Sequence, residues 1–314
     1  MNIIFFGSSH FAVPSLEALI KSGHKILCVV TQPDRKKGRG LHLGGTSVKL
    51  AASEMGLKTY QPLHINTAEA ITFLKAFGAD LFIIISYGQI LSQEILDIPR
   101  LFALNAHASL LPQYRGAAPI NWALINGEKT SGVTIMKMEL KMDAGPIMMQ
   151  QAVDILQQDT ALILEVKLAK VAQQLIGTAL EKIASKDFEW MPQDEKEATF
   201  APKLKKENGS IDWQEPAFKI HNLIRGCLVW PGAFTHYKGR LLKIFTSRVV
   251  RLSDPAVSRA PGRIIKISKQ GIAVATGEGD LLIESLQVQG KKPMTAPEFL
   301  LGHKLSSGDM LEKK

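Results

Sequence analysis

Short apolar runs alternate with amphipathic stretches along the first two-thirds of the chain. This alternation is typical of βαβ units, in which helices connect the strands of a mostly parallel sheet. The expected strands are Asn2–Phe6, Ile26–Thr31, Leu81–Ile85, Phe102–His107 and Gly132–Met138. The expected helices are Val13–Ser22, Ser47–Met55, Thr67–Phe77 and Thr160–Ala184. The pattern therefore predicts an α/β fold with a Rossmann-like beginning.

The helix ends carry their own signals. Asn66 and Glu69 have the spacing of a capping box at the start of the third helix, and Gly56 and Gly78 are C-terminal stops. The fourth helix shows an apolar stripe at helical spacing. We expect this helix to pack on the sheet and to close a first domain at about residue 184.

The pattern changes over residues 185–210, which are rich in charge, Pro and Gly and show little periodicity. We interpret this stretch as a linker between a first domain, 1–184, and a second, 211–314. In the second domain, short β runs are separated by turn residues. These runs are Leu241–Phe245, Gly262–Ile267, Gly271–Thr276 and Leu281–Val288. They predict a small antiparallel β-barrel of the OB type.

Composition narrows the class of protein. The chain has 314 residues, of which 46% are hydrophobic, so it can bury a full core. Its apolar runs are far shorter than the ~20 residues that cross a bilayer. No basic segment precedes the first apolar run, which argues against a signal peptide and for a cytoplasmic protein. Cys28 and Cys227 lack metal-site or disulfide spacing, and we expect both in the core.

The net charge of +9 is unevenly distributed. Residues 1–203 hold 20 Lys and Arg against 19 Asp and Glu, whereas residues 204–314 hold 18 against 10. The second part therefore carries a net charge of +8. A basic domain of this kind indicates a polyanionic partner, either nucleic acid or an acidic membrane surface, unless the charge serves only solubility.

Candidate chemistry gathers at the end of the fourth expected strand. Because side chains alternate across a strand, Asn105 and His107 lie on one face and Ala106 on the other. Asp143 follows the next apolar run, so its carboxylate can reach the same edge of the sheet, where α/β proteins bind ligands. An Asn-x-His pair alone is most often structural. The flanking Ser109–Pro112 and the later Asp143-x-Gly145 raise the case for a catalytic role.

Nucleotide-binding loops are missing from the sequence. The first strand leads into Phe6-Gly7-Ser8-Ser9-His10, which lacks the glycine spacing of a dinucleotide-binding loop. No phosphate-binding G-x-x-x-x-G-K-[ST] motif occurs either. NAD and ATP are thus not expected at this loop.

The motif around the candidate site resembles that of the folate-dependent formyltransferases. The resemblance begins with Asn105-x-His107-x-Ser109-Leu110-Leu111-Pro112 and continues with Tyr114-Arg115-Gly116. It extends over nearly the whole chain in ordered matches, which are Thr31–Arg35, Gly38–Gly40, Arg115–Ile120, Ala201–Leu204, Ile211–Trp213 and Trp230–Gly232. The resemblance implies a Rossmann-like catalytic domain and an OB-like C-terminal domain.

The resemblance also implies the reaction. A formyl group would pass from 10-formyltetrahydrofolate to the amino group of methionine on initiator tRNA, through a tetrahedral intermediate and without a metal. Asn105, His107 and Asp143 match the family's catalytic residues. Asn105 would donate to the developing oxyanion, and His107 would add a second donor. Asp143 would hold the imidazole or an intervening water in place and favour the charged form of the imidazole.

The remaining site residues follow from the same resemblance. The folate cleft would include the loop Ser109, Leu110, Leu111 and Pro112. The segment after the third strand would line the pterin pocket with backbone groups, and it comprises Tyr87, Gly88, Gln89, Ile90 and Leu91. The basic loop would contact the tRNA acceptor arm through Arg35, Lys36, Lys37 and Arg39. We expect a monomer that has no membrane partner and a basic loop that orders on RNA.

Two departures and two rivals remain open. Where the family usually has Thr-Pro-Asp or Thr-Pro-Glu, this chain has Ser8-Ser9-His10, which leaves the role of His10 unassigned. Gly44–Lys49 replaces the usual Pro-x-Pro-Val-Lys after the basic loop. The nearest rival is a formyltransferase that acts on a small amine. A basic barrel would have no obvious function in such an enzyme. The other is a catalytically silent nucleic-acid-binding protein, against which the three intact polar residues argue.

Overall fold

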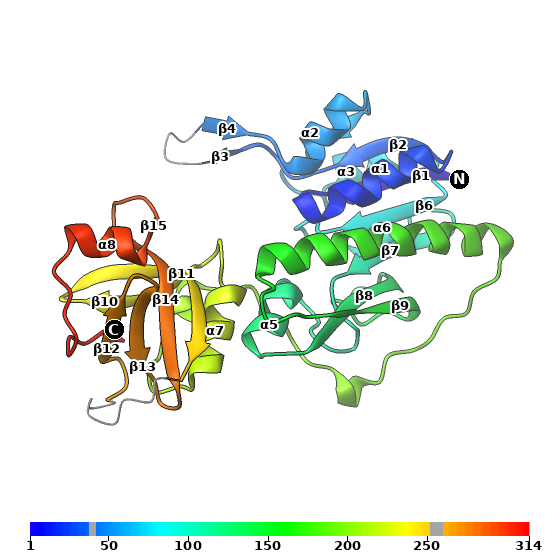
Figure 1. Ribbon diagram of the computed structural model, residues 1–314. Helices are drawn as coiled ribbons and strands as arrows, with labels where there is room; N and C mark the ends of the chain where they lie inside the picture. Colours follow the sequence, from blue (N-terminus) through cyan, green and yellow to red (C-terminus); the bar gives the residue numbers. More distant parts are fainter. Residues whose placement is uncertain (38–41, 252–259, 314) are drawn as a thin grey trace. The chain divides into compact units, whose positions relative to one another are not determined.

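The computed structural model describes residues 1–37, 42–251 and 260–313 (Figure 1). Its contacts divide the chain into two compact units. The first unit comprises Met1–Pro119, Thr130–Asp154 and Glu165–Ala201. The second comprises Ile120–Lys129, Ile155–Leu164 and Pro202–Lys314. Each unit is therefore assembled from segments that are separate in the sequence.

The first unit is built on a seven-stranded sheet with the order β5-β2-β1-β6-β7-β8-β9. From one edge to the other, the strands are Thr59–Tyr60, Lys25–Val30, Asn2–Gly7, Leu81–Ile85, Phe102–His107, Thr130–Lys137 and Ile147–Asp154. The first five are parallel, and β8 and β9 run antiparallel to their neighbours. The expected mostly parallel α/β sheet is thus confirmed.

The sequence pattern predicted the strands that are buried and missed the edge strand that is exposed. Strand β6 is buried at every position, as expected of a central parallel strand covered on both faces, and its bounds are those predicted. The edge strand β9 has the sequence Ile-Met-Met-Gln-Gln-Ala-Val-Asp and is exposed over much of its length. Because it neither alternates cleanly nor forms an apolar run, its pattern predicted nothing.

Helices surround this sheet, and α6 runs along β6 and β7 (Figure 1). The α-helices of the first unit are α1 Val13–Lys21, α2 Ser47–Glu54, α3 Ala68–Lys75, α4 Gln93–Leu96 and most of α6, Ala161–Ser185. Three short 3₁₀ helices of the chain are η1 His10–Ala12, η2 Glu195–Glu197 and η3 Lys206–Gly209. Strands β3, Arg35–Lys37, and β4, His42–Gly44, pair with each other as a two-stranded antiparallel ribbon.

The predicted capping box at α3 is wrong by one residue. Thr67 is the N-cap, and its hydroxyl accepts the Ala70 N–H. The Asn66 side chain is instead bonded to the backbone of Ile90 and Ser92, so it is not available to the helix. Both residue types can cap, and only the tertiary contacts of Asn66 decide between them.

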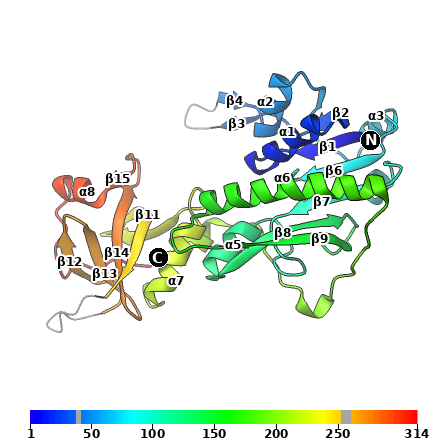
Figure 2. The same cartoon turned by 45° about the vertical axis from the view of Figure 1, so that its right-hand side comes forward.

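The second unit contains an antiparallel sheet of the kind expected, with β10-β11-β14-β13-β12 in order and β15 beside β14 (Figure 2). Its strands in chain order are β10 Ala233–Tyr237, β11 Arg240–Val250, β12 Ile264–Ser268, β13 Gly271–Ala275, β14 Asp280–Val288 and β15 Met294–Thr295. Its helices are α5 Pro119–Ile125, α7 Ala217–Gly226 and α8 Ala296–Gly302. The sequence pattern had predicted neither β10 nor the three helices.

The C-terminal segment 308–312 connects the two ends of this strand order. The His236 N–H of β10 donates to the Glu312 carbonyl at 2.9 Å, and the Glu312 N–H returns the bond at 2.8 Å. At β12, the Ile264 N–H donates to the Asp309 carbonyl and the Gly308 N–H donates to the Ile264 carbonyl, both at 2.8 Å. The segment therefore satisfies backbone groups that an open sheet leaves unpaired.

Ending the chain at Ser307 should destabilise the second unit. The truncation removes these backbone bonds and the Leu311 side chain, which is buried in the core and is worth about 2–3 kcal/mol. We expect the apparent Tm to fall by roughly 5–10 °C in a thermal scan. A protein that lacks only Lys313 and Lys314 is the control. Equal melting of the two truncated proteins would contradict a role for the segment in completing the sheet.

Candidate active site

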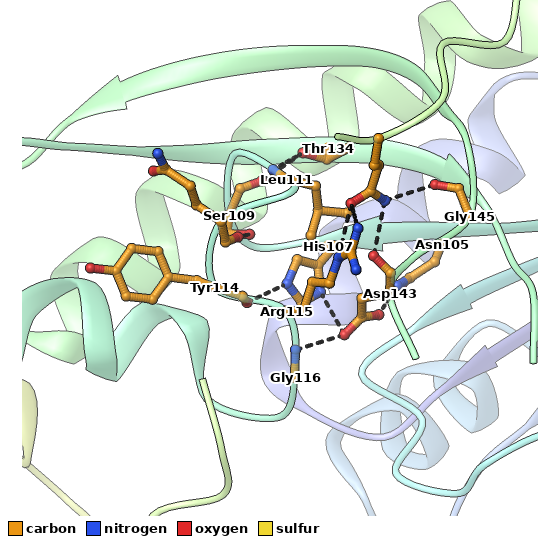
Figure 3. Close-up of polar contacts among 12 residues, drawn as sticks. Asn105, His107, Ser109, Leu111, Tyr114, Arg115, Gly116, Thr134, Asp143 and Gly145 are labelled. Atoms are coloured by element: carbon orange, nitrogen blue, oxygen red, sulfur yellow. Dashed lines mark hydrogen bonds and ion pairs between the residues drawn. The ribbon is translucent and has the colours of Figure 1, made fainter. Parts of the chain in front are cut away.

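Asn105 and His107 lie at the carboxyl end of β7, where both side chains meet the Asp143 carboxylate (Figure 3). The Asn105 amide nitrogen is 3.4 Å from Oδ1 of Asp143, and Nδ1 of His107 is 3.7 Å from Oδ2. His107 and Asp143 are 6% and 12% exposed. The structure thus brings the three predicted residues together in a largely desolvated place.

Asp143 reaches this place by a different route from the one expected. Strand β8 is antiparallel to β7, so its last residue, Lys137, pairs with Leu104 rather than lying beside His107. The loop from β8 to β9 must therefore fold back to bring Asp143 to Asn105. Asp143 has φ 51°. A Cβ on Gly145 would clash with the Lys137 carbonyl oxygen. Glycine is required there because the backbones touch.

The contacts of His107 define its protonation. Nε2 lies 3.0 Å from the carbonyl oxygen of Tyr114, which can only accept, so Nε2 carries a hydrogen. Nδ1, the other ring nitrogen, faces Asp143. Oδ2 of Asp143 also accepts the Gly116 N–H at 2.8 Å. The turn around Arg115 therefore touches both members of the pair.

The loop after β7 is fixed by polar contacts to the neighbouring strands. The Ser109 hydroxyl donates to the Gln113 carbonyl at 2.6 Å, and the Thr134 hydroxyl donates to the Ser109 carbonyl at 2.7 Å. The Gln150 amide donates to the Leu111 carbonyl at 2.8 Å. The predicted folate loop, from Ser109 to Pro112, is thus a rigid continuation of the strand that carries His107.

The second predicted folate segment, residues 87–91, has mixed orientation. The side chains of Tyr87 and Leu91 are buried in the hydrophobic core of the first unit. Gln89 bonds to the backbone of residues 62–65, and Ile90 is exposed. The segment is therefore anchored by the side chains of Tyr87, Gln89 and Leu91, which leaves Gly88, the exposed Ile90 and the backbone as the groups that a ligand could meet.

A cavity of about 600 Å³ lies next to the Asp143 loop. It is lined by Gln93, Leu96, Asp97, Pro99, residues 101–103 and residues 137–141. None of the predicted folate residues lines it.

A network around Arg115 escaped the sequence analysis. Arg115 is 1% exposed, and its guanidinium donates to the Gln193 side-chain oxygen and to Glu195. Hydrogen bonds from Lys141 and Arg115 lower the pKa of the Glu195 carboxyl. Gln193 and Glu195 belong to the stretch interpreted as a linker, where polar composition gave no signal. Only the burial of an arginine reveals that partners must exist.

The loop after β1 is held by short polar side chains. The Ser8 hydroxyl donates to the Tyr87 carbonyl at 2.9 Å and accepts the Gln32 N–H. His10 is exposed and lies near Glu165 of α6, whose pKa is raised by burial while His10 opposes the shift. His10 thus has Glu165 as a charged neighbour, and the role of His10 stays unassigned.

Part of the predicted basic loop is a strand. Arg35, Lys36 and Lys37 form β3, and the Arg35 guanidinium donates to the Gln32 side chain at 3.2 Å. Arg39 lies outside the described residues. Within the described residues, no group of three or more His, Cys, Asp and Glu side chains could hold a metal ion. No helix of that part of the chain is long and apolar enough to span a membrane.

With the fold and the site in view, comparison with known families gives a clear result. Residues 1–180 match the family model described as formyl transferase, and residues 203–304 match that of the formyl transferase C-terminal domain. The chain belongs to the formyltransferase family. A sugar 3N-formyl transferase, WlaRD, solved with dTDP and 5-N-formyl-THF, has the same fold at a TM-score of 0.66 and 19% identity, covering 93% of this chain and 99% of that one.

Curated relatives match over the full length. The methionyl-tRNA formyltransferase of Thermodesulfovibrio yellowstonii is 46% identical over 307 residues, which cover 98% of this chain and 97% of the relative. The methionyl-tRNA formyltransferase of Citrifermentans bemidjiense is 40% identical over 314 residues, which cover 100% of this chain and 97% of the relative. The chain is thus similar to these enzymes in both of its units.

The two cysteines should be chemically inert in the folded protein. Both are buried, and burial raises the pKa of Cys28 to about 11 and that of Cys227 to about 12. At pH 8 both thiols therefore stay protonated and are poor nucleophiles. We expect no rapid reaction with a disulfide reagent until denaturant is added, after which both should react. Rapid labelling of either thiol in the native protein would contradict this assignment.

Proposed function

We propose that this protein transfers the formyl group of 10-formyltetrahydrofolate to the amino group of methionyl-tRNA, the initiator species, in the cytoplasm. The observation that carries the proposal is full-length similarity to methionyl-tRNA formyltransferases in a chain that keeps Asn105, His107 and Asp143 in mutual contact. We also propose that it acts as a monomer. The folate is a substrate here, and no metal takes part.

The reaction forms one C–N bond and breaks another. The methionine amine attacks the formyl carbon, the carbonyl oxygen becomes an oxyanion, and N10 of the folate leaves with a proton that the amine gives up. The Asn105 amide has two N–H groups, so one can face Asp143 while the other donates to the oxyanion. Such a donor stabilises charge that exists only in the transition state.

His107 and Asp143 would handle the proton. Because Nε2–H of His107 is bonded to Tyr114, a second donor to the oxyanion has to come from Nδ1. The 3.7 Å separation from Asp143 is longer than a hydrogen bond, which leaves an Nδ1 proton able to serve either the carboxylate or the reacting oxygen.

The two substrates would bind to different parts of the chain. We propose that the folate lies against Ser109–Pro112 and residues 87–91. We propose that Arg35, Lys36, Lys37 and Arg39 contact the acceptor arm. We also propose that the basic domain 211–314, which follows the catalytic domain 1–184 and the connecting residues 185–210 in the sequence, binds tRNA. The net charge of +8 over residues 204–314 supports the polyanionic partner.

A transfer assay tests the proposal. Purified protein should move the formyl group from 10-formyltetrahydrofolate to charged initiator tRNA, and it should leave uncharged tRNA and small amino sugars unmodified. Transfer to a small amine at a comparable rate would point instead to the nearest rival. No transfer to any acceptor, with tRNA still bound, would favour the silent RNA-binding protein.

Asn105→Ala and His107→Ala should each lower the turnover of this reaction steeply. The loss of one oxyanion donor typically costs on the order of 10²–10³ in rate. Folate affinity and Tm should change little, because neither change removes core packing. Gln113→Ala is a matched control in the same loop, since Gln113 is exposed. If either active-site variant keeps activity within a few-fold of the parent, its catalytic assignment is wrong.

Neutralising Lys36, Lys37 and Arg39 together should weaken tRNA binding. Each lost phosphate contact flattens the log–log salt dependence of affinity by roughly 0.7–0.9. The measurement is tRNA affinity over a salt series for the parent and the triple variant, with folate affinity as the control. Parallel salt slopes would show that the three cations do not contact phosphates, and an equal loss of folate binding would indicate a structural role.

A further inference from the structure

The segment that follows α6 returns to the catalytic loop. The Arg115 N–H donates to the Thr199 carbonyl at 2.9 Å, and the Ala201 N–H donates to the Arg115 carbonyl at 2.7 Å. The Thr199 hydroxyl accepts the Tyr114 N–H at 2.8 Å. Residues 199–201 therefore pair with the turn at 114–118 as an added strand would, so this part of the expected linker belongs to the site.

Gln193 uses both ends of its side-chain amide within the site. Its nitrogen donates to the carbonyl of Asp143 at 2.9 Å and to that of Gly145 at 2.7 Å. Its oxygen accepts from Nε of Arg115 at 3.0 Å and from Nη2 at 2.8 Å. A half-buried amide with this many partners is strongly constrained, and Figure 3 shows the guanidinium and the two carbonyls that it joins.

These contacts connect two loops that meet at the catalytic pair. Arg115 lies between Tyr114, whose carbonyl holds His107, and Gly116, whose N–H holds Asp143. Gln193 thus contacts one loop through Arg115 and the other through the backbone carbonyls of Asp143 and Gly145. The distance between Nδ1 of His107 and Asp143 depends on how these two loops are held.

We propose that Gln193 is a positioning residue for the formyl transfer proposed above, on which this inference rests. Only an uncharged amide fits both partners, because the two carbonyls need a donor and the guanidinium needs an acceptor. A glutamate would keep the acceptor and turn an oxygen toward the two carbonyls. A displacement of about 1 Å between reacting groups can cost on the order of 10² in rate.

Folding does not depend on Gln193 alone. Glu195 still pairs with Arg115 at 3.0 Å, so the buried cation keeps a charged partner when Gln193 is changed. The backbone pairing of residues 199–201 also remains. The expected defect is therefore in catalysis more than in stability.

The test compares Gln193→Met, which keeps the length and removes all four bonds, with Gln193→Glu, which keeps only the acceptor. Both should lower kcat for charged tRNA by about 10- to 100-fold. KM for the tRNA should stay within about two-fold, and Tm within a few degrees. Glu197→Ala is the matched control, since Glu197 is exposed in the same segment. The pH–rate profile should also change shape in both Gln193 variants and stay unchanged in the control.

A second readout does not require activity. The His107 ring resonance, assigned by its loss in His107→Ala, should titrate differently in Gln193→Met and as in the parent in Glu197→Ala. Unchanged kcat in a variant of an active parent, or a fall in kcat matched by the loss of folded protein, would overturn the inference. If the parent itself transfers no formyl group, the proposed function fails, and the NMR titration alone decides about Gln193: an unchanged titration overturns its role.

Discussion

The structure of the site depends on holding one carboxylate, that of Asp143, in a place that is almost closed to water. A charge there is stable only when its oxygens are bonded. The Gly116 N–H, the Asn105 amide and His107 all converge on it. Each comes from the carboxyl end of β7 or from the loop that follows. The carboxylate thus fixes the strand end, the 107–116 loop and the β8–β9 loop in one arrangement.

Much of this could be predicted from sequence because local pattern and topology agree. The bounds of β6 follow from a continuous apolar run, and those of β7 are also the predicted ones. The shared face of Asn105 and His107 follows from strand alternation. The approach of Asp143 was harder to derive. Its loop leaves an antiparallel strand, and the sense of that strand is set by pairing with β7, which no pattern within residues 132–138 encodes.

The missed features share one physical property, which is that their partners are distant in sequence. Gln193 contacts Arg115 and Asp143 across long stretches of chain, and its polar neighbourhood has the composition of a linker. Thr67 caps α3 because a distant loop occupies Asn66. Long-range contacts decided each case, and periodicity carries no record of them.

The return of residues 193–201 to the loop that follows β7 has a consequence for exchanging modules between related enzymes. A junction placed directly after α6, at Ser185, would replace Gln193 and Thr199 along with the basic C-terminal part. The corresponding residues of the other protein would then have to form the same hydrogen bonds with the Arg115 turn of this chain. A junction after Ala201 keeps Gln193 and Thr199 with the Arg115 turn, so a chimera built there takes all of these contacts from one parent.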